Sequence, residues 1–97
     1  MTYQKVKKAI LPTLKREGVR KAALFGSVAR NEAKNTSDVD LLVQLKKGAT
    51  LLDLSGLKIE LEKKLGRRVD VITYHSLHPL LKDEILEDQR IIYEKKS

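Results

Sequence analysis

The chain has 97 residues, of which 41% are hydrophobic and 34% are charged, and its formal net charge is +7. This composition excludes an intrinsically disordered chain, and the sequence has neither an apolar run of membrane-span length nor a signal-peptide pattern. With no cysteine it can form neither disulfides nor thiolate metal sites, so we expect a cytoplasmic protein. From its length we expect a single domain over residues 1–97.

The first third of the chain predicts a helix, a strand and a short helix. Apolar residues at a spacing of four predict a helix over residues 3–17, and Pro12 is expected to kink it or divide it in two. Gly18 suits the end of that helix. An apolar run over residues 19–25 predicts a central strand, and residues 27–33 predict a short helix that leads into a polar loop.

The remainder of the chain continues the alternation of strands and helices. The expected elements are a strand over residues 38–45, a helix over 50–65, a strand over 68–73, a helix over 76–87 and an edge strand over 90–93. Gly56 is costly inside a helix, and we attribute it to close packing. The alternation predicts an α/β (α+β) fold, a small mixed sheet flanked by helices. The first two strands are joined by so short a connection that both parallel and antiparallel pairing stay open.

Three aspartates interrupt apolar strand patterns. Asp38 and Asp40 point to one face of a predicted strand, opposite Val39 and Leu41, and Asp70 interrupts another strand. If the two strands are neighbours, the three carboxylates repel one another, and a cation is needed between them. Magnesium accepts a few carboxylates together with phosphate oxygens and water. We therefore predict two Mg²⁺ ions bridged by Asp38 and Asp40, with Asp70 completing the second site and accepting the proton of the nucleophile.

A Gly26-Ser27 pair joins the first predicted strand to the short helix, eleven residues before the paired acids. Backbone N–H groups at such a turn suit a phosphate, and glycine lets the backbone approach a triphosphate. Arg30 lies one helical turn beyond Ser27 on the same face, where it either contacts a phosphate or is a counter-charge for the acids. The alternative for the pair itself is an ordinary strand-to-helix turn with Ser27 as N-cap.

The acids also have structural alternatives. Asp38 and Asp40 can be surface residues at the start of a strand, and Asp70 can be an ion-pair partner of Arg67 or Arg68. The presence of all three acids, on strands expected to be neighbours, favours the metal site.

His75 and His78 are three residues apart, but no third ligand has a suitable spacing, so a role in helix entry is favoured over metal binding. The positive charge favours an anionic partner. The basic residues are dispersed, however, and lack the interleaved aromatic residues that stack on bases, so a solvated surface is favoured over nucleic-acid binding.

The same segments resemble the signature of the nucleotidyltransferase superfamily that includes DNA polymerase beta. The resemblance lies in Gly26-Ser27, Ala29-Arg30, Ser37-Asp38-Val39-Asp40-Leu41-Leu42-Val43 and the third-carboxylate strand Arg68-Val69-Asp70-Val71. Over nearly its whole length the chain is similar to the minimal nucleotidyltransferases of bacteria and archaea. Many members have Gly at the position of Asn31, and we expect little consequence because Asn tolerates unusual backbone angles.

This resemblance implies magnesium-dependent transfer of a nucleoside monophosphate, AMP from ATP in the first instance, with release of pyrophosphate. Small members commonly accompany a helical HEPN-domain protein, often an RNA-cleaving toxin, and some act as antitoxins by adenylylating a tyrosine of that partner. Larger relatives carry an extra helical domain that helps to hold the base. We therefore expect the base or acceptor pocket to need a partner protein or a second copy, in a hetero- or homo-oligomer.

Three functions compete on the sequence. The first is nucleotidyl transfer to a partner protein, favoured because all three acids and the Gly-Ser turn are present. The second is a non-catalytic binding module that neutralises a helical partner by masking it. The third is nucleotidyl transfer to RNA or to a small molecule.

Overall fold

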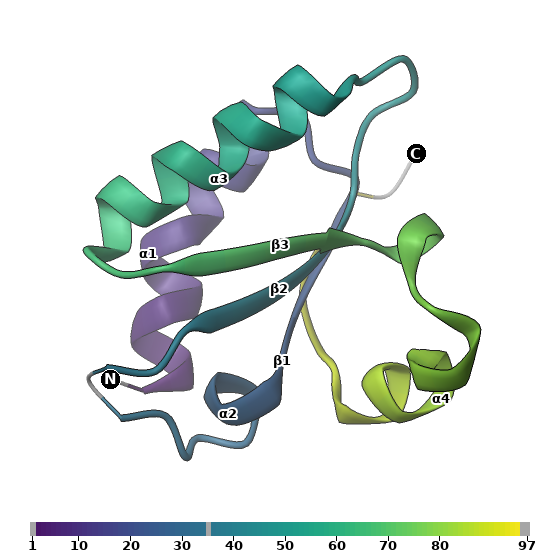
Figure 1. Cartoon of the computed structure of the whole chain (residues 1–97). Coiled ribbons are helices and arrows are strands. Elements are labelled where there is room, and N and C mark those ends of the chain that lie inside the picture. Colours follow the sequence, from purple (N-terminus) through teal and green to yellow (C-terminus); the bar gives the residue numbers. More distant parts are fainter. Residues whose placement is uncertain (1, 35, 96–97) are drawn as a thin grey trace.

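A four-stranded sheet with helices packed on it forms the protein (Figure 1). The computed structural model describes residues 2–34 and 36–95. In chain order the elements are α1 (Tyr3–Arg16), β1 (Lys21–Phe25), α2 (Gly26–Ala29), β2 (Val39–Gln44), α3 (Leu51–Leu65), β3 (Val69–Thr73), a 3₁₀ turn (Tyr74–Ser76), α4 (Pro79–Asp88) and β4 (Arg90–Glu94). The predicted α+β class is confirmed.

The sheet is mixed, with the strand order β3-β2-β1-β4. β1 pairs with both β2 and β4 in the antiparallel sense, and β2 pairs with β3 in the parallel sense. The predicted central position of β1 and edge position of β4 are therefore confirmed. The open question about the first two strands is settled as antiparallel pairing.

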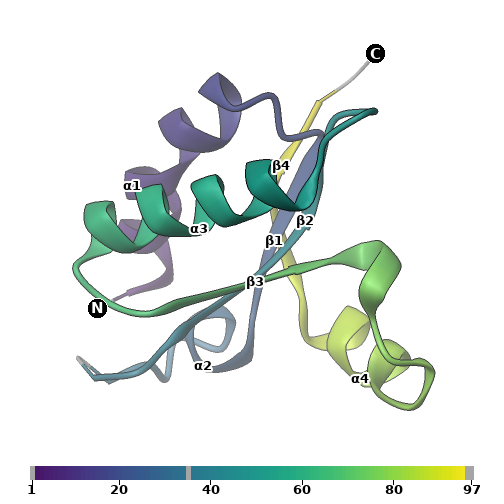
Figure 2. The same ribbon diagram turned by 45° about the horizontal axis from the view of Figure 1, so that its top comes forward.

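The hydrophobic core lies between one face of the sheet and the pair α1 and α3, which run side by side over it (Figures 1 and 2). The helices contribute their apolar stripes, and the strands contribute every second residue. Fully buried members are Val6, Ile10 and Leu14 of α1, Val39, Leu41 and Val43 of β2, and Leu61 of α3. This arrangement turns the even-numbered residues of β2 and β3 toward the opposite face.

α4 lies on the other side of the sheet from α1 and α3 (Figure 2). All ten of its residues are at least partly exposed, and Leu80 is 85% exposed. Its N-terminus is defined by Pro79 at the first helical position and by His78, whose Nδ1 accepts a hydrogen bond from the N–H of Leu80 at 3.1 Å. The predicted role of His78 in helix entry is confirmed.

Of the two alternatives given for Pro12, division into two helices is excluded, because the exposed Pro12 lies inside the single helix α1. Two other local predictions are wrong. α2 ends at Ala29, earlier than expected. Gly56 is exposed on α3, and among the described residues no heavy atom lies within 4 Å of the position a Cβ would take. Close packing is therefore not the reason for this glycine.

In the part of the chain that the structure describes, no helix combines the length and apolarity needed to cross a membrane.

Candidate active site

Asp40 and Asp70 are side by side on the two parallel strands. The register pairs Val39 with Val69 and Asp40 with Asp70. Because Val39 and Val69 are buried in the core, the two aspartates point to the opposite face. Asp40 is half-buried, and the side chain of Asp70 is 39% exposed. The structure thus brings together two of the three predicted acids, on a face that is partly open to solvent.

Asp38 precedes β2 and is exposed. Its charge is near enough to raise the pKa of Asp40, so it lies in the neighbourhood of the pair. Among residues 2–34 and 36–95, however, no three carboxylate or imidazole groups are placed so that they hold a metal ion as they stand. The register brings Asp40 and Asp70 together and the charge of Asp38 reaches Asp40, whereas a shared metal site of all three acids stays a prediction.

Gly26 packs directly against the Asp40 carboxylate. The antiparallel register pairs Phe25, the last residue of β1, with Asp40, so the following turn begins beside the acids. Gly26 has a φ of +72°, a left-handed conformation that favours glycine. A Cβ added to Gly26 would lie 2.4 Å from Oδ2 of Asp40. Glycine is required here both for the conformation of the turn and for its approach to the acid.

Burial raises the pKa of the Asp40 carboxyl above its ordinary value. The negative charges of Asp70 and Asp38 raise this pKa further, whereas the Arg30 guanidinium opposes the shift, and Asp88 adds a smaller repulsion. A carboxylate that is both desolvated and surrounded by like charges gains free energy when a cation binds beside it.

The turn is also held by Asp88, the last residue of α4. Oδ2 of Asp88 accepts hydrogen bonds from the N–H of Gly26 at 2.9 Å and from Nη1 of Arg30 at 2.8 Å. Arg30 lies 3.6 Å from Glu32 as well, and its pKa is raised, mainly by the hydrogen bond with Asp88. Arg30 therefore pairs with Asp88 and also acts as a counter-charge to Asp40 through its field, and its predicted contact with a phosphate stays a prediction. Ser27 is half-buried in the same turn.

Arg67 fixes the loop that leads into β2. Its Nη1 donates hydrogen bonds to the carbonyl oxygens of Ser37, at 3.1 Å, and of Lys34, at 3.3 Å. Arg67 therefore holds the backbone immediately before Asp38 and is not the ion-pair partner of Asp70. The ion-pair partner of Asp70 is Arg68, whose Nε lies 3.8 Å from Oδ1 of Asp70. Both side chains are exposed, so this pair contributes little to folding stability.

The loop after α2 depends on Asn31, which has a φ of +59°. Its side-chain oxygen accepts a hydrogen bond from the N–H of Tyr3 at 3.1 Å. Asn31 takes up the left-handed conformation that Gly adopts readily, which fits the expectation that Asn at this position has little consequence. The loop is tied to the start of α1 as a result.

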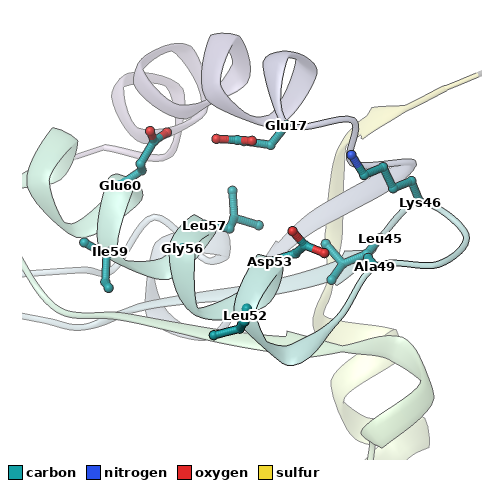
Figure 3. A pocket seen from close by; sticks show the side chains of 10 residues that line it. All are labelled: Glu17, Leu45, Lys46, Ala49, Leu52, Asp53, Gly56, Leu57, Ile59 and Glu60. Atoms are coloured by element: carbon teal, nitrogen blue, oxygen red, sulfur yellow. The ribbon is translucent and has the colours of Figure 1, made fainter.

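A cavity of about 330 Å³ is lined by α3, by the loop between β2 and α3 and by Glu17, which follows α1, on the side of the sheet that α3 covers (Figure 3). Figure 3 shows Glu17 and Glu60 on one side of it and Leu52 and Ile59 on α3. The acids of β2 and β3 point to the opposite face, so this cavity is separate from the candidate site.

Sequence analysis missed the roles of Asp88 and Arg67. Asp88 is 62 residues from Gly26, and Arg67 is 30 residues from Ser37. Acids and bases at helix ends and strand starts are typical of solvated surfaces, so no local pattern distinguished these two.

The fold places the chain among minimal nucleotidyltransferases. A solved structure described provisionally as a minimal nucleotidyltransferase is 40% identical to it, with a TM-score of 0.79, and the match covers 93% of this chain and 95% of that one. A toxin-antitoxin complex crystallised with AMP-PNP also contains the fold, with a TM-score of 0.79 over 93% of this chain and 74% of that one, at 18% identity.

The family model described as "Polymerase beta, Nucleotidyltransferase" matches residues 8–97. A Methanocaldococcus jannaschii protein, named provisionally as a protein adenylyltransferase, is 54% identical over 88 residues, which are 91% of this chain and 95% of that protein. The protein adenylyltransferase MntA of Thermococcus cleftensis is 41% identical over 73 residues, 75% of this chain and 74% of that protein. The chain belongs to the polymerase beta nucleotidyltransferase family.

Proposed function

We propose that this chain is a magnesium-dependent nucleotidyltransferase that moves AMP from ATP to a hydroxyl group of a partner protein. The observation that carries the proposal is the placement of Asp40 beside Asp70, with the Gly26 turn packed against Asp40. Two neighbouring carboxylates beside a glycine turn that packs against one of them are suited to a nucleotide and its cation. Membership of the family supports the same reaction.

The residues fit magnesium. Mg²⁺ is usually held by one or two carboxylates together with phosphate oxygens and water, rather than by a cage made of protein alone. Asp40 and Asp70 supply two such carboxylates in register, and Asp38 lies near them. The pKa of Asp40 is raised first by burial and then by repulsion from Asp70 and Asp38, and a bound cation offsets both effects. We assign the metal to Asp38, Asp40 and Asp70.

The reaction forms a bond between the acceptor oxygen and the α-phosphorus and breaks the bond between that phosphorus and the pyrophosphate oxygen. Bound magnesium supplies charge neutralisation for the phosphates during this displacement. Gly26 and Ser27 hold the triphosphate through the turn, and Arg30 offers a guanidinium on the same side. Asp70, whose side chain is 39% exposed, accepts the proton that leaves the acceptor hydroxyl.

The acceptor that we propose is a HEPN-type helical toxin, with this chain as its antitoxin. The similar Thermococcus cleftensis protein is named a protein adenylyltransferase. A Shewanella oneidensis complex of a tri-AMPylated HEPN toxin with an MNT antitoxin has the same fold, with a TM-score of 0.74 and 18% identity over 97% of this chain and 74% of that one. Both support protein AMP transfer as the activity to test first.

The test is transfer of label from ATP to a helical HEPN-type protein from the same organism, in the presence of magnesium. We expect labelling of the partner by the unchanged protein and by Asp83→Asn, which removes an exposed acid of α4. Asp40→Asn should lower the rate by about a hundredfold or more, as expected for loss of a group that acts on the reacting phosphate.

Transfer that survives Asp38→Asn or Asp40→Asn would reject the proposed site. If the variant with all three acids changed to Asn transfers no label and still neutralises the partner as well as the unchanged protein does, binding alone accounts for neutralisation. Labelling of RNA in place of the protein would identify a different acceptor.

A further inference from the structure

Asp88 places one carboxylate oxygen between two donors of the Gly26 turn. The same atom, Oδ2, accepts from the backbone N–H of Gly26 at 2.9 Å and from the Arg30 guanidinium at 2.8 Å. The side chain of Asp88 is 28% exposed and that of Arg30 is 48% exposed, so the contact with Gly26 is partly buried and the contact with Arg30 is open to solvent. A backbone amide and a guanidinium converging on one anionic oxygen is also the arrangement that binds a phosphate oxygen.

The two donors are those that the proposed function assigns to the triphosphate. The Gly26 N–H carries one hydrogen, so a phosphate oxygen and the Asp88 carboxylate cannot both be its close partner. Two anions held side by side at this turn would also repel each other. Binding of a triphosphate at Gly26 and Arg30 therefore requires Asp88 to leave.

α4, which carries Asp88, is packed loosely enough to move. Every residue of α4 is at least partly exposed, and Leu80 and Leu81 are 85% and 50% exposed. A helix with so little buried apolar surface is held to the domain by few favourable contacts, and its opening costs little free energy. Asp88 supplies two polar contacts between this helix and the turn.

We propose that Asp88 is an internal competitor of the nucleotide: its carboxylate occupies the position of a phosphate oxygen at Gly26 and Arg30 until a triphosphate displaces it. Asp88 thereby sets the affinity for the nucleotide and couples nucleotide binding to the position of α4. The proposal rests on the proposed function of Gly26 and Arg30. If Asp88 instead only orients the turn and Arg30 for the nucleotide, its removal weakens binding.

The opposite signs of these two effects define the experiment, which is titration of the full chain with Mg²⁺-ATP by calorimetry. Asp88→Asn keeps an oxygen that accepts from the Gly26 N–H but removes the charge that competes with phosphate. We expect this variant to bind Mg²⁺-ATP about tenfold more tightly than the unchanged protein, the loss of one charge-assisted competitor. Asp83→Asn removes a charge from the exposed side of the same helix and should bind as the unchanged protein does.

Equal or weaker binding by Asp88→Asn overturns the proposal, and weaker binding makes Asp88 a positioning residue. If the unchanged protein and Asp88→Asn both fail to bind Mg²⁺-ATP, the proposed function of the turn fails, and the competitor role fails with it. If Asp88→Asn binds Mg²⁺-ATP and the unchanged protein does not, the result supports the proposal, with Asp88 competing strongly enough to block the site.

A second measurement covers the case in which Asp88→Asn does not fold. Amide hydrogen exchange of α4 in the unchanged protein should become faster when Mg²⁺-ATP is added at saturation, because displacement of Asp88 frees the helix. Unchanged or slower exchange in α4, with nucleotide bound, contradicts the displacement.

Discussion

A Cβ on Gly26 would lie 2.4 Å from Oδ2 of Asp40, well inside contact distance. The turn that follows β1 therefore packs directly against Asp40, the first acid of β2. A side chain cannot be added to the turn unless the carboxylate moves, and the carboxylate belongs to the candidate active site.

Gly26→Ala should reduce nucleotidyl transfer by about a hundredfold, since displacement of a reacting group by roughly 1 Å has an effect of this size. It should also lower the free energy of unfolding by about 1–2 kcal/mol, the cost of a left-handed conformation for alanine, with the clash added to it. Gly48→Ala is the matched control, because Gly48 has a φ of +86° and, among the described residues, no heavy atom within 4 Å of the place its new methyl group would take. Transfer assays and thermal unfolding of both variants check this; equal transfer by the two would contradict it.

Asp40→Asn should stabilise the protein while it abolishes transfer. The pKa of Asp40 is raised in the folded chain by burial and by Asp70, so ionisation at neutral pH destabilises the folded state. Without metal, we expect the melting temperature of the variant at pH 7 to be higher by about 2–5 °C. Thermal unfolding of the variant and the unchanged protein in the presence of a chelator measures this difference in melting temperature.

The pH dependence follows from the same shift. Stability associated with the neutral Asp40 carboxyl is present below its unfolded pKa and is lost as the pH rises through the higher folded pKa. The advantage of Asp40→Asn should therefore be small below about pH 4, near the ordinary pKa of aspartate, and should grow toward neutrality. A difference in melting temperature that does not change with pH would show that Asp40 is not the group responsible.

Magnesium with ATP should raise the melting temperature, because both bind the folded state and relieve the repulsion among the acids. At about ten times the dissociation constant the gain in unfolding free energy is about 1.4 kcal/mol. A chelator should reverse the gain, and Asp40→Asn should reduce it. Calorimetric unfolding with and without ligand is the measurement; no shift with millimolar magnesium and ATP would contradict the metal site.

Gly56→Ala should increase the free energy of unfolding by about 0.5–1 kcal/mol, because alanine is the better helix former and a methyl group at this position meets open space. Denaturant unfolding measures the change. A loss of stability would show that the glycine has a structural role that the isolated chain does not reveal.

The alternation of residues in β2 and β3 was enough to predict the faces of Asp40 and Asp70, because the period of a strand is a local property. The start of α3 is likewise set by a local contact, in which the N–H of Thr50 donates to Oδ2 of Asp53 at 2.8 Å. What these patterns determine is the direction of each side chain relative to its own backbone.

The contacts of Asp88 and Arg67 could not be predicted in this way. Each joins segments that are distant in sequence, and each depends on how the elements pack rather than on the propensity of any one of them. The surroundings of Gly56 were misjudged for a related reason. Whether a costly residue meets solvent or a neighbour is decided by tertiary structure.

The one-sided core has a consequence for how this domain can diversify. Folding stability is concentrated in the layer made by α1 and α3, whereas the ten residues of α4 on the other side are all accessible. Substitutions on that helix away from Asp88 alter little buried surface, so they are tolerated at small thermodynamic cost. New recognition properties can therefore evolve on α4, while the core between α1, α3 and the sheet stays unchanged.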